Sequence, residues 1–337
     1  MHRWPWSVDV VGDPAAVASF PSPAALGALA DVPLPAGGRT AERFVALAEI
    51  AAIDLSVARL AEGHADALAI LAEAGVDFPD LMGPLGVWAA GTAAVSASRT
   101  GAGWLLRGTK PWCSGASSLR HALVTAAAPD GARLFVVDVA APGLAPDPTS
   151  WPAVGMRGSD TLDVAMEVAL DATAAVGGPE WYTDRPGFWF GSVGVAACWL
   201  GGAIGAVRSA AGAVRSAAGS VLASRPDPHQ LAALGAAAAR CDTLAAAIER
   251  AGHWIDDHPC DPARTARVLA LGIRQAVEEG CLAVAADVGR AGGAGHVTHD
   301  VEQARRLADL PVYIRQHHGG RDAAAYACAL LESGLGA

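Results

Sequence analysis

The spacing of apolar residues near the N-terminus predicts a long helical segment over residues 40–75. Pro33 and Pro35 precede it and mark its entry. His64 falls on the same stripe as Leu60 and Leu68, where a histidine is expected to be a hydrogen-bonded core residue. The apolar positions that recur near the period of one helix face are Ile50, Ile53, Val57, Leu60, Leu68 and Leu71.

The apolar period changes from about Gly83 onward. Residues 104–107, 121–127 and 133–139 are predicted as strands, and the turn sequence Pro-Asp-Gly joins the last two. Residues 163–170 alternate cleanly and place four apolar side chains on one face. The middle of the chain is therefore predicted as a β-rich block.

Helical signals return after Pro186 and continue toward the C-terminus. Residues 229–257 form an Ala-rich helical stretch, and Asp261 with Pro262 predicts the start of a second helix that runs to Arg290. The next signals are a helix end at Gly292 and Gly293, a capping spacing from Asp300 to Gln303, a kink or end at Pro311, and a last helix after Gly320.

One segment, residues 187–207, carries no charge and is long enough to cross a membrane. It is rich in glycine and lies between segments with the composition of soluble proteins. We therefore predict a buried helix that packs closely through small residues. The N-terminal sequence has no apolar core of the kind found in secretory signals. We expect a cytoplasmic protein with no membrane partner.

Charge and cysteine content exclude several classes of protein. The 337 residues carry a formal net charge of −10 and are 52% hydrophobic, which argues against disorder and permits a large core. Lysine and arginine are scattered without a basic stripe, so we expect no nucleic-acid partner. The six cysteines form no CxxC pair and no metal spacing with histidine. Free thiols and no metal site are predicted.

The segments 108–116 (GTKPWCSGA) and 151–166 (WPAVGMRGSDTLDVAM) carry the most informative motif. Trp112 on a strand edge offers an aromatic face for stacking, and Ser114 offers a hydroxyl for a ring nitrogen. The glycines let the backbone approach a ligand closely. The pattern suits a β-domain that binds a flat polar ring. In the alternative interpretation, Trp112 is a core residue and Ser114 a turn residue.

This motif resembles the flavin-binding middle domain of the acyl-CoA dehydrogenase superfamily, and the resemblance covers most of the chain. It implies an α+β, mostly α fold with an N-terminal helical domain (1–82), a middle β-barrel domain (83–180) and a C-terminal helical bundle (181–337). The implied cofactor is FAD. In that family the indole corresponding to Trp112 flanks the isoalloxazine, and the hydroxyl corresponding to Ser114 bonds to flavin N5.

Two further segments are similar in position to cofactor-binding parts of the family. Backbone groups of Trp88, Ala89 and Ala90 would meet the flavin pyrimidine edge, although the family's Thr-Glu-Pro is absent. The second segment is the glycine turn that lies near the ADP half of FAD in the family: Gly292, Gly293 and Gly295. Here Gly289 stands in place of the usual Gln, and on the preceding helical hairpin residues 225–230 stand in place of Arg-x-x-Phe-Gly. Helix termination explains the glycine turn equally well.

The family's catalytic carboxylate has no counterpart in the aligned sequence. His317, or His318 with a one-residue slip, falls where glutamate is expected, and the alternative family position falls near Gly191. A histidine can act as a general base near neutral pH. The histidines also suit a polar helix end. Phe188 and Trp189 are predicted to form an aromatic floor of the substrate pocket.

The resemblance implies an enzyme, an FAD-dependent oxidoreductase that dehydrogenates an acyl thioester carried by coenzyme A or a carrier protein. The first alternative is a flavin-dependent monooxygenase of the same fold, which uses reduced flavin and O2 and also lacks the carboxylate. The second alternative is a catalytically degenerate member that binds an acyl group or a partner. The resemblance and the glycine-rich helix predict a homodimer or homotetramer.

Overall fold

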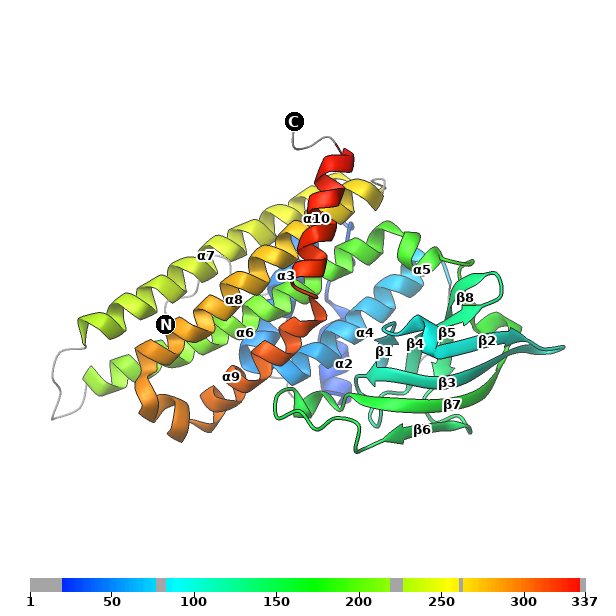
Figure 1. The fold of residues 1–337 in the computed structure, drawn as a ribbon, viewed down its shortest axis with the longest axis horizontal. Coiled ribbons are helices and arrows are strands. Elements are labelled where there is room, and N and C mark those ends of the chain that lie inside the picture. The colour runs from blue at the N-terminus through cyan, green and yellow to red at the C-terminus, as the bar shows by residue number, and fades with distance from the viewer. Residues whose placement is uncertain (1–19, 77–82, 219–226, 261–262, 334–337) are drawn as a thin grey trace.

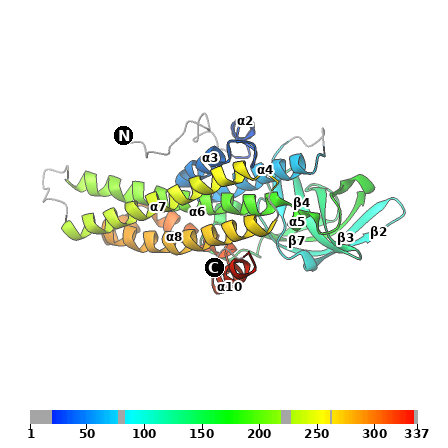
Figure 2. The ribbon, with the colours of Figure 1, turned by 90° about the horizontal axis from the view of Figure 1, so that it is seen from above.

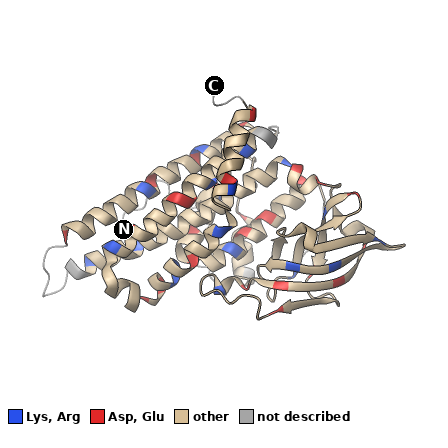
Figure 3. Cartoon of the chain, in the orientation of Figure 1, with Lys and Arg blue, Asp and Glu red and all other residues tan. Residues whose placement is uncertain are grey.

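Long helices make up one end of the molecule and a mixed β-sheet makes up the other (Figure 1). The computed structural model describes residues 20–76, 83–218, 227–260 and 263–333. Seen from above, three long helices run alongside one another and away from the sheet: α6 (Pro186–Ala218), α7 (Pro228–Asp257) and α8 (Ala263–His299) (Figure 2). Basic and acidic residues are interspersed over both ends in the view of Figure 3.

The N-terminal helices are α2 (Pro23–Ala30), α3 (Thr40–Ile53) and α4 (Leu55–Glu73). The helical segment predicted over residues 40–75 is confirmed, but it is divided in two at Asp54. This residue has extended backbone angles, and its carboxylate accepts hydrogen bonds from the N–H groups of Ser56 and Val57 at 2.8 and 3.0 Å. Asp54 therefore caps α4 and sets a new direction for the chain.

The sheet has the strand order β6-β7-β3-β2-β4-β5-β8, with β1 paired in parallel to β4. All the predicted strands are present, and the alternation over 163–170 places Val164, Met166 and Val168 in the β-domain core. The strands are β1 (Leu85–Trp88), β2 (Val95–Arg99), β3 (Gly103–Cys113), β4 (His121–Ala128), β5 (Gly131–Asp138), β6 (Leu144–Asp147), β7 (Leu162–Asp171) and β8 (Ala175–Val176).

The C-terminal helices are α5 (Trp181–Asp184), α6 (Pro186–Ala218), α7 (Pro228–Asp257), α8 (Ala263–His299), α9 (Val301–Tyr313) and α10 (Gly320–Ser333). Gly293 interrupts α8 with a φ of 68°, as the glycine pair predicted. Asp300 caps α9 through the N–H of Gln303 at 3.0 Å. Pro311 lies inside α9, which passes into the 3-10 turn Ile314–Gln316. The predicted cap at Asp261 and Pro262 lies outside the described residues.

Helix α6 contains the uncharged segment 187–207, and it lies at the centre of the bundle. Of its most apolar window, 89% is buried, which confirms the buried helix. A Cβ atom at Gly201 or Gly205 would overlap the carbonyl oxygens of Ala48 or Ala52 in α3, so glycine permits this close helix contact. Helix α7 is also long and apolar enough to cross a membrane, with 33% of its window buried.

The loop between β6 and β7 joins the sheet to the helices. The N–H of Met156 donates to the Asp309 carboxylate of α9 at 2.5 Å, and a Cβ atom at Gly155 would overlap the Ala308 carbonyl. Burial raises the pKa of Asp309, while the bond from Met156 opposes that shift. These contacts hold the β6–β7 loop against α9. The division into three domains stays a prediction; the described strands lie between Leu85 and Val176.

Candidate functional site

Trp112 stands on a β-bulge at the end of β3. Lys110 pairs with Val164 and Cys113 with Leu162, so β3 contains one residue more than β7 over this stretch. The backbone of Trp112 is left-handed, with a φ of 57°, and its N–H donates to the Asp163 carboxylate at 3.2 Å. The residue is 61% exposed. The bulge therefore presents the indole at the surface, and the interpretation of Trp112 as a core residue is wrong.

Ser114 follows the bulge and is buried. Its hydroxyl lies 2.9 Å from the Thr161 hydroxyl, which lies 2.8 Å from the Ser159 hydroxyl. Ser159 donates in turn to the Met156 carbonyl at 2.7 Å. We call Ser114, Thr161 and Ser159 the hydroxyl chain. It connects the bulge to the β6–β7 loop that packs on α9.

The end of β1 lies beside the same segment. The indole N–H of Trp88 donates to the Ser114 carbonyl at 3.0 Å, so the structure brings these two predicted residues together. The Ala89 carbonyl accepts from the Thr125 hydroxyl at 2.8 Å, and the Thr92 hydroxyl lies 3.3 Å from that carbonyl and 2.9 Å from the Thr125 hydroxyl. Ala90 is exposed. Of these residues, Trp88 is thus a structural support for Ser114.

Lys110 is fully buried at the start of the bulge. Its ammonium group donates to the carbonyl and the hydroxyl of Thr125 at 2.6 and 2.8 Å. No carboxylate in the described part of the chain forms an ion pair with it. Burial lowers the pKa of Lys110 to about 8. The β-domain therefore holds a basic group two positions before Trp112.

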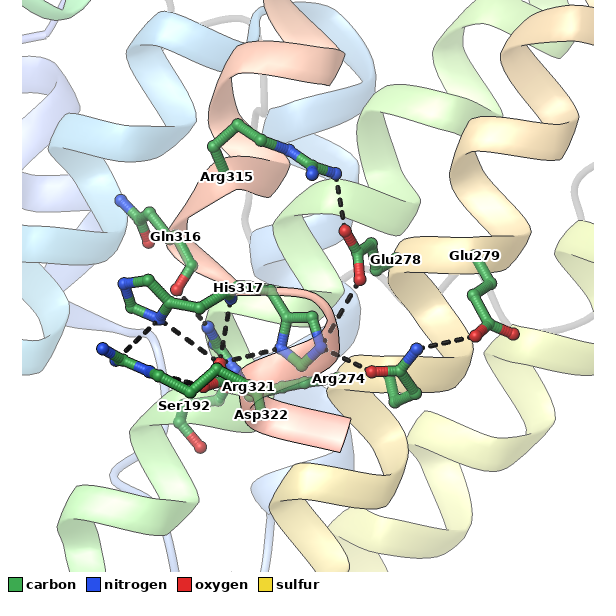
Figure 4. A network of polar contacts seen from close by, with 11 residues as sticks. Ser192, Arg274, Glu278, Glu279, Arg315, Gln316, His317, Arg321 and Asp322 are labelled. Carbon is green, nitrogen blue, oxygen red and sulfur yellow. Dashed lines mark hydrogen bonds and ion pairs between the residues drawn. The ribbon is translucent and has the colours of Figure 1, made fainter. Parts of the chain in front are cut away.

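His317 lies inside a polar network between α8 and α10 (Figure 4). Its Nε2 is 2.8 Å from the Gln275 amide oxygen and 3.4 Å from Glu278, and its Nδ1 is 3.2 Å from Asp322. Burial, and then the charge of Arg274, lowers its pKa. These contacts tie the start of α10 to α8 and enclose the imidazole.

His318 lies next to this network with its side chain 54% exposed, and its N–H donates to Asp322 at 3.0 Å. Among the described residues, neither His317 nor His318 forms a hydrogen bond, ion pair or ring contact with Trp112 or Ser114. The catalytic role of these histidines stays a prediction.

Phe188 and Trp189 are half-buried at the start of α6, and their rings meet edge to face at 5.1 Å between centroids. Tyr182 of α5 packs against Phe188 in the same way, at 5.5 Å. The two predicted pocket residues thus belong to an aromatic group at the end of α6 nearest α5.

The glycine turn of α8 lies far from the bulge. Gly292, Gly293 and Gly295 are close to the C-terminal end of α8, which is at the end of the bundle away from the sheet (Figures 1 and 2). A helix of this length spans roughly 50 Å. A single copy of the chain therefore does not bring these glycines to Trp112.

Helix α4 carries a group of charged residues that sequence reasoning missed. Arg59 donates to Glu62 at 2.7 Å, and Arg43 of α3 donates to Asp66 at 2.7 Å. We call these four residues the carboxyl cluster. The Asp66 carboxylate lies 2.8 Å from the position of a Cβ atom at Gly191. A carboxylate therefore does occupy the space beside Gly191, but it comes from α4.

Burial raises the pKa of Glu62 to about 8, and Asp66 raises it further while Arg59 opposes the shift. The Tyr313 hydroxyl and the Cys198 thiol lie close enough to interact with this group, and burial raises the pKa of both. The sequence signal that could have revealed this cluster was a charged stripe on an otherwise apolar helix, made of Arg59, Glu62 and Asp66.

His64 accepts the Leu85 N–H at 3.1 Å, which confirms it as a hydrogen-bonded core histidine.

No protein-family model and no curated protein sequence matches this chain. Solved structures do match it. The dibenzothiophene monooxygenase TdsC from Paenibacillus sp. A11-2, in a complex with FMN and indole, is 19% identical, with 87% of this chain and 84% of that chain covered and a TM-score of 0.76. KijD3, in complex with FMN and a dTDP-linked amino sugar, is 20% identical, with 95% and 86% covered and a TM-score of 0.76.

Butyryl-CoA dehydrogenase from Megasphaera elsdenii is 16% identical, with 88% of this chain and 83% of that chain covered and a TM-score of 0.75. The chain has the acyl-CoA dehydrogenase fold. The fold predicted from the sequence is therefore confirmed. Proteins of the acyl-CoA dehydrogenase fold include both monooxygenases and dehydrogenases, so the site has to distinguish between these reactions.

Proposed function

We propose that this chain is a flavin-dependent oxidoreductase and that the Trp112 bulge holds the flavin ring. The observation that carries the proposal is the exposed indole in a left-handed conformation, followed two positions later by a buried hydroxyl. A bulky residue in this conformation is strained, and such strain persists where the surrounding structure imposes it, often at ligand sites. Trp112 would stack on the ring, and Ser114 would bond to N5.

Within one copy of the chain, the residues that fit a flavin are those that would contact its ring, not those that would contact its adenine end. Sequence resemblance implies FAD, but the glycine turn of α8 lies at the other end of the bundle. FMN has no adenine end, and TdsC and KijD3 have been solved with FMN. One copy is thus sufficient for the ring of either flavin, and a second copy is needed for the glycine turn to contact FAD.

Monooxygenation is the reaction that we propose. Reduced flavin would supply two electrons, so that one atom of O2 enters the substrate and the other leaves as water. The enclosure of His317 supports this choice, because the imidazole nitrogens face Gln275, Glu278 and Asp322. The residue aligned with the usual base is therefore committed to the α8–α10 junction. In this reaction the protein binds the ring and the substrate and excludes water.

Dehydrogenation of an acyl thioester is the second candidate, and the carboxyl cluster favours it. Asp66 lies beside Gly191, where the alternative base position of the family falls, and Glu62 interacts with Asp66. A carboxyl group whose pKa is raised by burial suits general acid–base chemistry near neutral pH. Either carboxylate would take the α-proton of the thioester, while bound flavin would accept the β-hydride.

In dehydrogenation the flavin would accept electrons from the substrate, whereas in monooxygenation O2 would accept electrons from reduced flavin. Purified protein would be mixed anaerobically with FMN or FAD, and bleaching by butyryl-CoA would be followed by absorbance. In a second assay, reduced FMN, O2 and indole as a probe substrate would be supplied, and oxygenated product would be measured. Product without bleaching supports monooxygenation, and bleaching supports dehydrogenation. Acyl-CoA binding without any flavin binding would indicate the degenerate alternative.

We also propose a cytoplasmic homodimer or homotetramer that acts on a small molecule. If the second reaction is correct, that molecule is an acyl thioester of coenzyme A or of a carrier protein. Sedimentation of the purified chain measures its oligomeric state directly. A monomer at micromolar concentration would contradict the proposed assembly.

A further inference from the structure

The hydroxyl chain has three donor hydrogens and makes three contacts, two between its own hydroxyls and one to the Met156 carbonyl. Ser114, Thr161 and Ser159 are each buried, and their three contacts measure 2.9, 2.8 and 2.7 Å. Each hydroxyl owns one hydrogen and two acceptor lone pairs. Contacts this short between oxygens are hydrogen bonds, so each requires one hydrogen.

Only one order of donors satisfies all three contacts. The Met156 carbonyl cannot donate, so the Ser159 hydrogen lies in the bond to Met156. The Thr161 hydrogen must then lie between Thr161 and Ser159, and the Ser114 hydrogen between Ser114 and Thr161. The chain therefore runs in one direction, and Ser114 has no hydrogen left for a ligand. Its oxygen retains acceptor lone pairs.

We propose that Thr161 and Ser159 are positioning residues that make Ser114 a hydrogen-bond acceptor, so that the site selects the reduced flavin ring over the oxidised one. This inference rests on the proposed function. N5 of the ring carries a hydrogen in the reduced state and only a lone pair in the oxidised state. A reduced ring therefore donates N5–H to Ser114, whereas an oxidised ring places lone pair against lone pair.

Turning the Ser114 hydroxyl toward an oxidised ring would leave two buried oxygens in contact without a hydrogen. The loss of one such bond corresponds to a factor of about ten in an equilibrium constant. The preference also agrees with a reaction in which flavin arrives already reduced. It gives the bulge a selectivity that stacking on Trp112 alone does not provide, because both redox states have an aromatic face.

The test compares the dissociation constants of oxidised FMN and of dithionite-reduced FMN, both measured anaerobically by protein fluorescence. The unaltered chain should bind reduced FMN at least about tenfold more tightly. For a two-electron couple, each tenfold preference raises the midpoint potential of bound FMN by about 30 mV relative to free FMN.

Two variants free the Ser114 hydrogen by different routes. Thr161→Val removes the acceptor of Ser114, which then becomes free to donate to oxidised FMN. Ser159→Ala frees Thr161 to donate to Ser114, and this has the same consequence if the first variant does not fold. Each should reduce the redox preference by about tenfold. The matched control is Ser118→Ala, whose hydroxyl contacts the Gly115 carbonyl outside the hydroxyl chain and should leave the preference unchanged.

The possible results separate the two proposals. If FMN binds but the folded variants retain the redox preference of the unaltered chain, the inference about Thr161 and Ser159 is overturned and the flavin site stands. Equal affinity of the unaltered chain for both redox states overturns it too. If neither redox state binds to the unaltered chain, the proposed function fails and the inference fails with it.

Discussion

Replacing Trp112 by glycine and by alanine separates backbone strain from stacking. Both variants lose the same indole contacts, so the difference between them reports the backbone alone. The left-handed conformation, with a φ of 57°, costs a residue with a Cβ atom about 1–2 kcal/mol. Glycine avoids that cost but loses roughly 0.5–1 kcal/mol more conformational entropy on folding. Trp112→Gly should therefore be more stable than Trp112→Ala, by up to about 1.5 kcal/mol.

The assay is urea denaturation of both variants, followed by far-UV circular dichroism. Trp254 provides a matched control because it lies within α7, where alanine is favoured over glycine by about 1 kcal/mol. The order of stability should thus be opposite at the two positions. An alanine variant at position 112 that is more stable than the glycine variant would refute the left-handed bulge. Both variants at position 112 should lose FMN affinity, whatever their stability.

Three further predictions concern the helices and their buried charges. Gly201→Ala should lower the free energy of unfolding by about 1–3 kcal/mol because its Cβ overlaps the Ala48 carbonyl, whereas Gly212→Ala, with open space around it, should raise it by up to about 1 kcal/mol in the same denaturation assay. Because the pKa of Glu62 is raised from near 4.5 in the unfolded chain to about 8, its stabilising contribution is complete below pH 4.5 and is lost as the pH rises through about 8. Glu62→Gln should flatten this part of the curve of unfolding free energy against pH. An unchanged curve would contradict the raised pKa of Glu62. His317→Ala should reduce hydrogen-exchange protection in α10 and leave FMN affinity unchanged, whereas a change confined to turnover would favour the general-base interpretation.

The sequence predicted the elements whose signals are local. The alternation of β7 and the break at Gly293 depend on neighbouring residues, and both are present. The predicted helix over residues 40–75 was interrupted because Asp54 is both a permissible helix residue and a good N-cap. Its carboxylate bonds to two N–H groups, and this outweighs continuation of the helix.

The candidate site was predictable only where one segment contains it. The sequence identified Trp112 and Ser114, but not the left-handed backbone that exposes the indole. The enclosure of His317 depends on side chains from α8 and α10, which alignment to a single segment does not include. Asp66 reaches Gly191 only because α4 packs on α6, so the missing carboxylate could not be located along the chain.

An FMN titration followed by visible absorbance shows whether the Trp112 bulge binds a flavin ring. The unaltered chain should bind one FMN per chain with a perturbed flavin spectrum, because Trp112 is exposed and placed for stacking. Trp112→Ala should abolish that perturbation and weaken binding by at least about tenfold, whereas Trp254→Ala in α7 should preserve both. A Trp112→Ala variant with the affinity and spectrum of the unaltered chain would show that the flavin ring does not bind at the bulge.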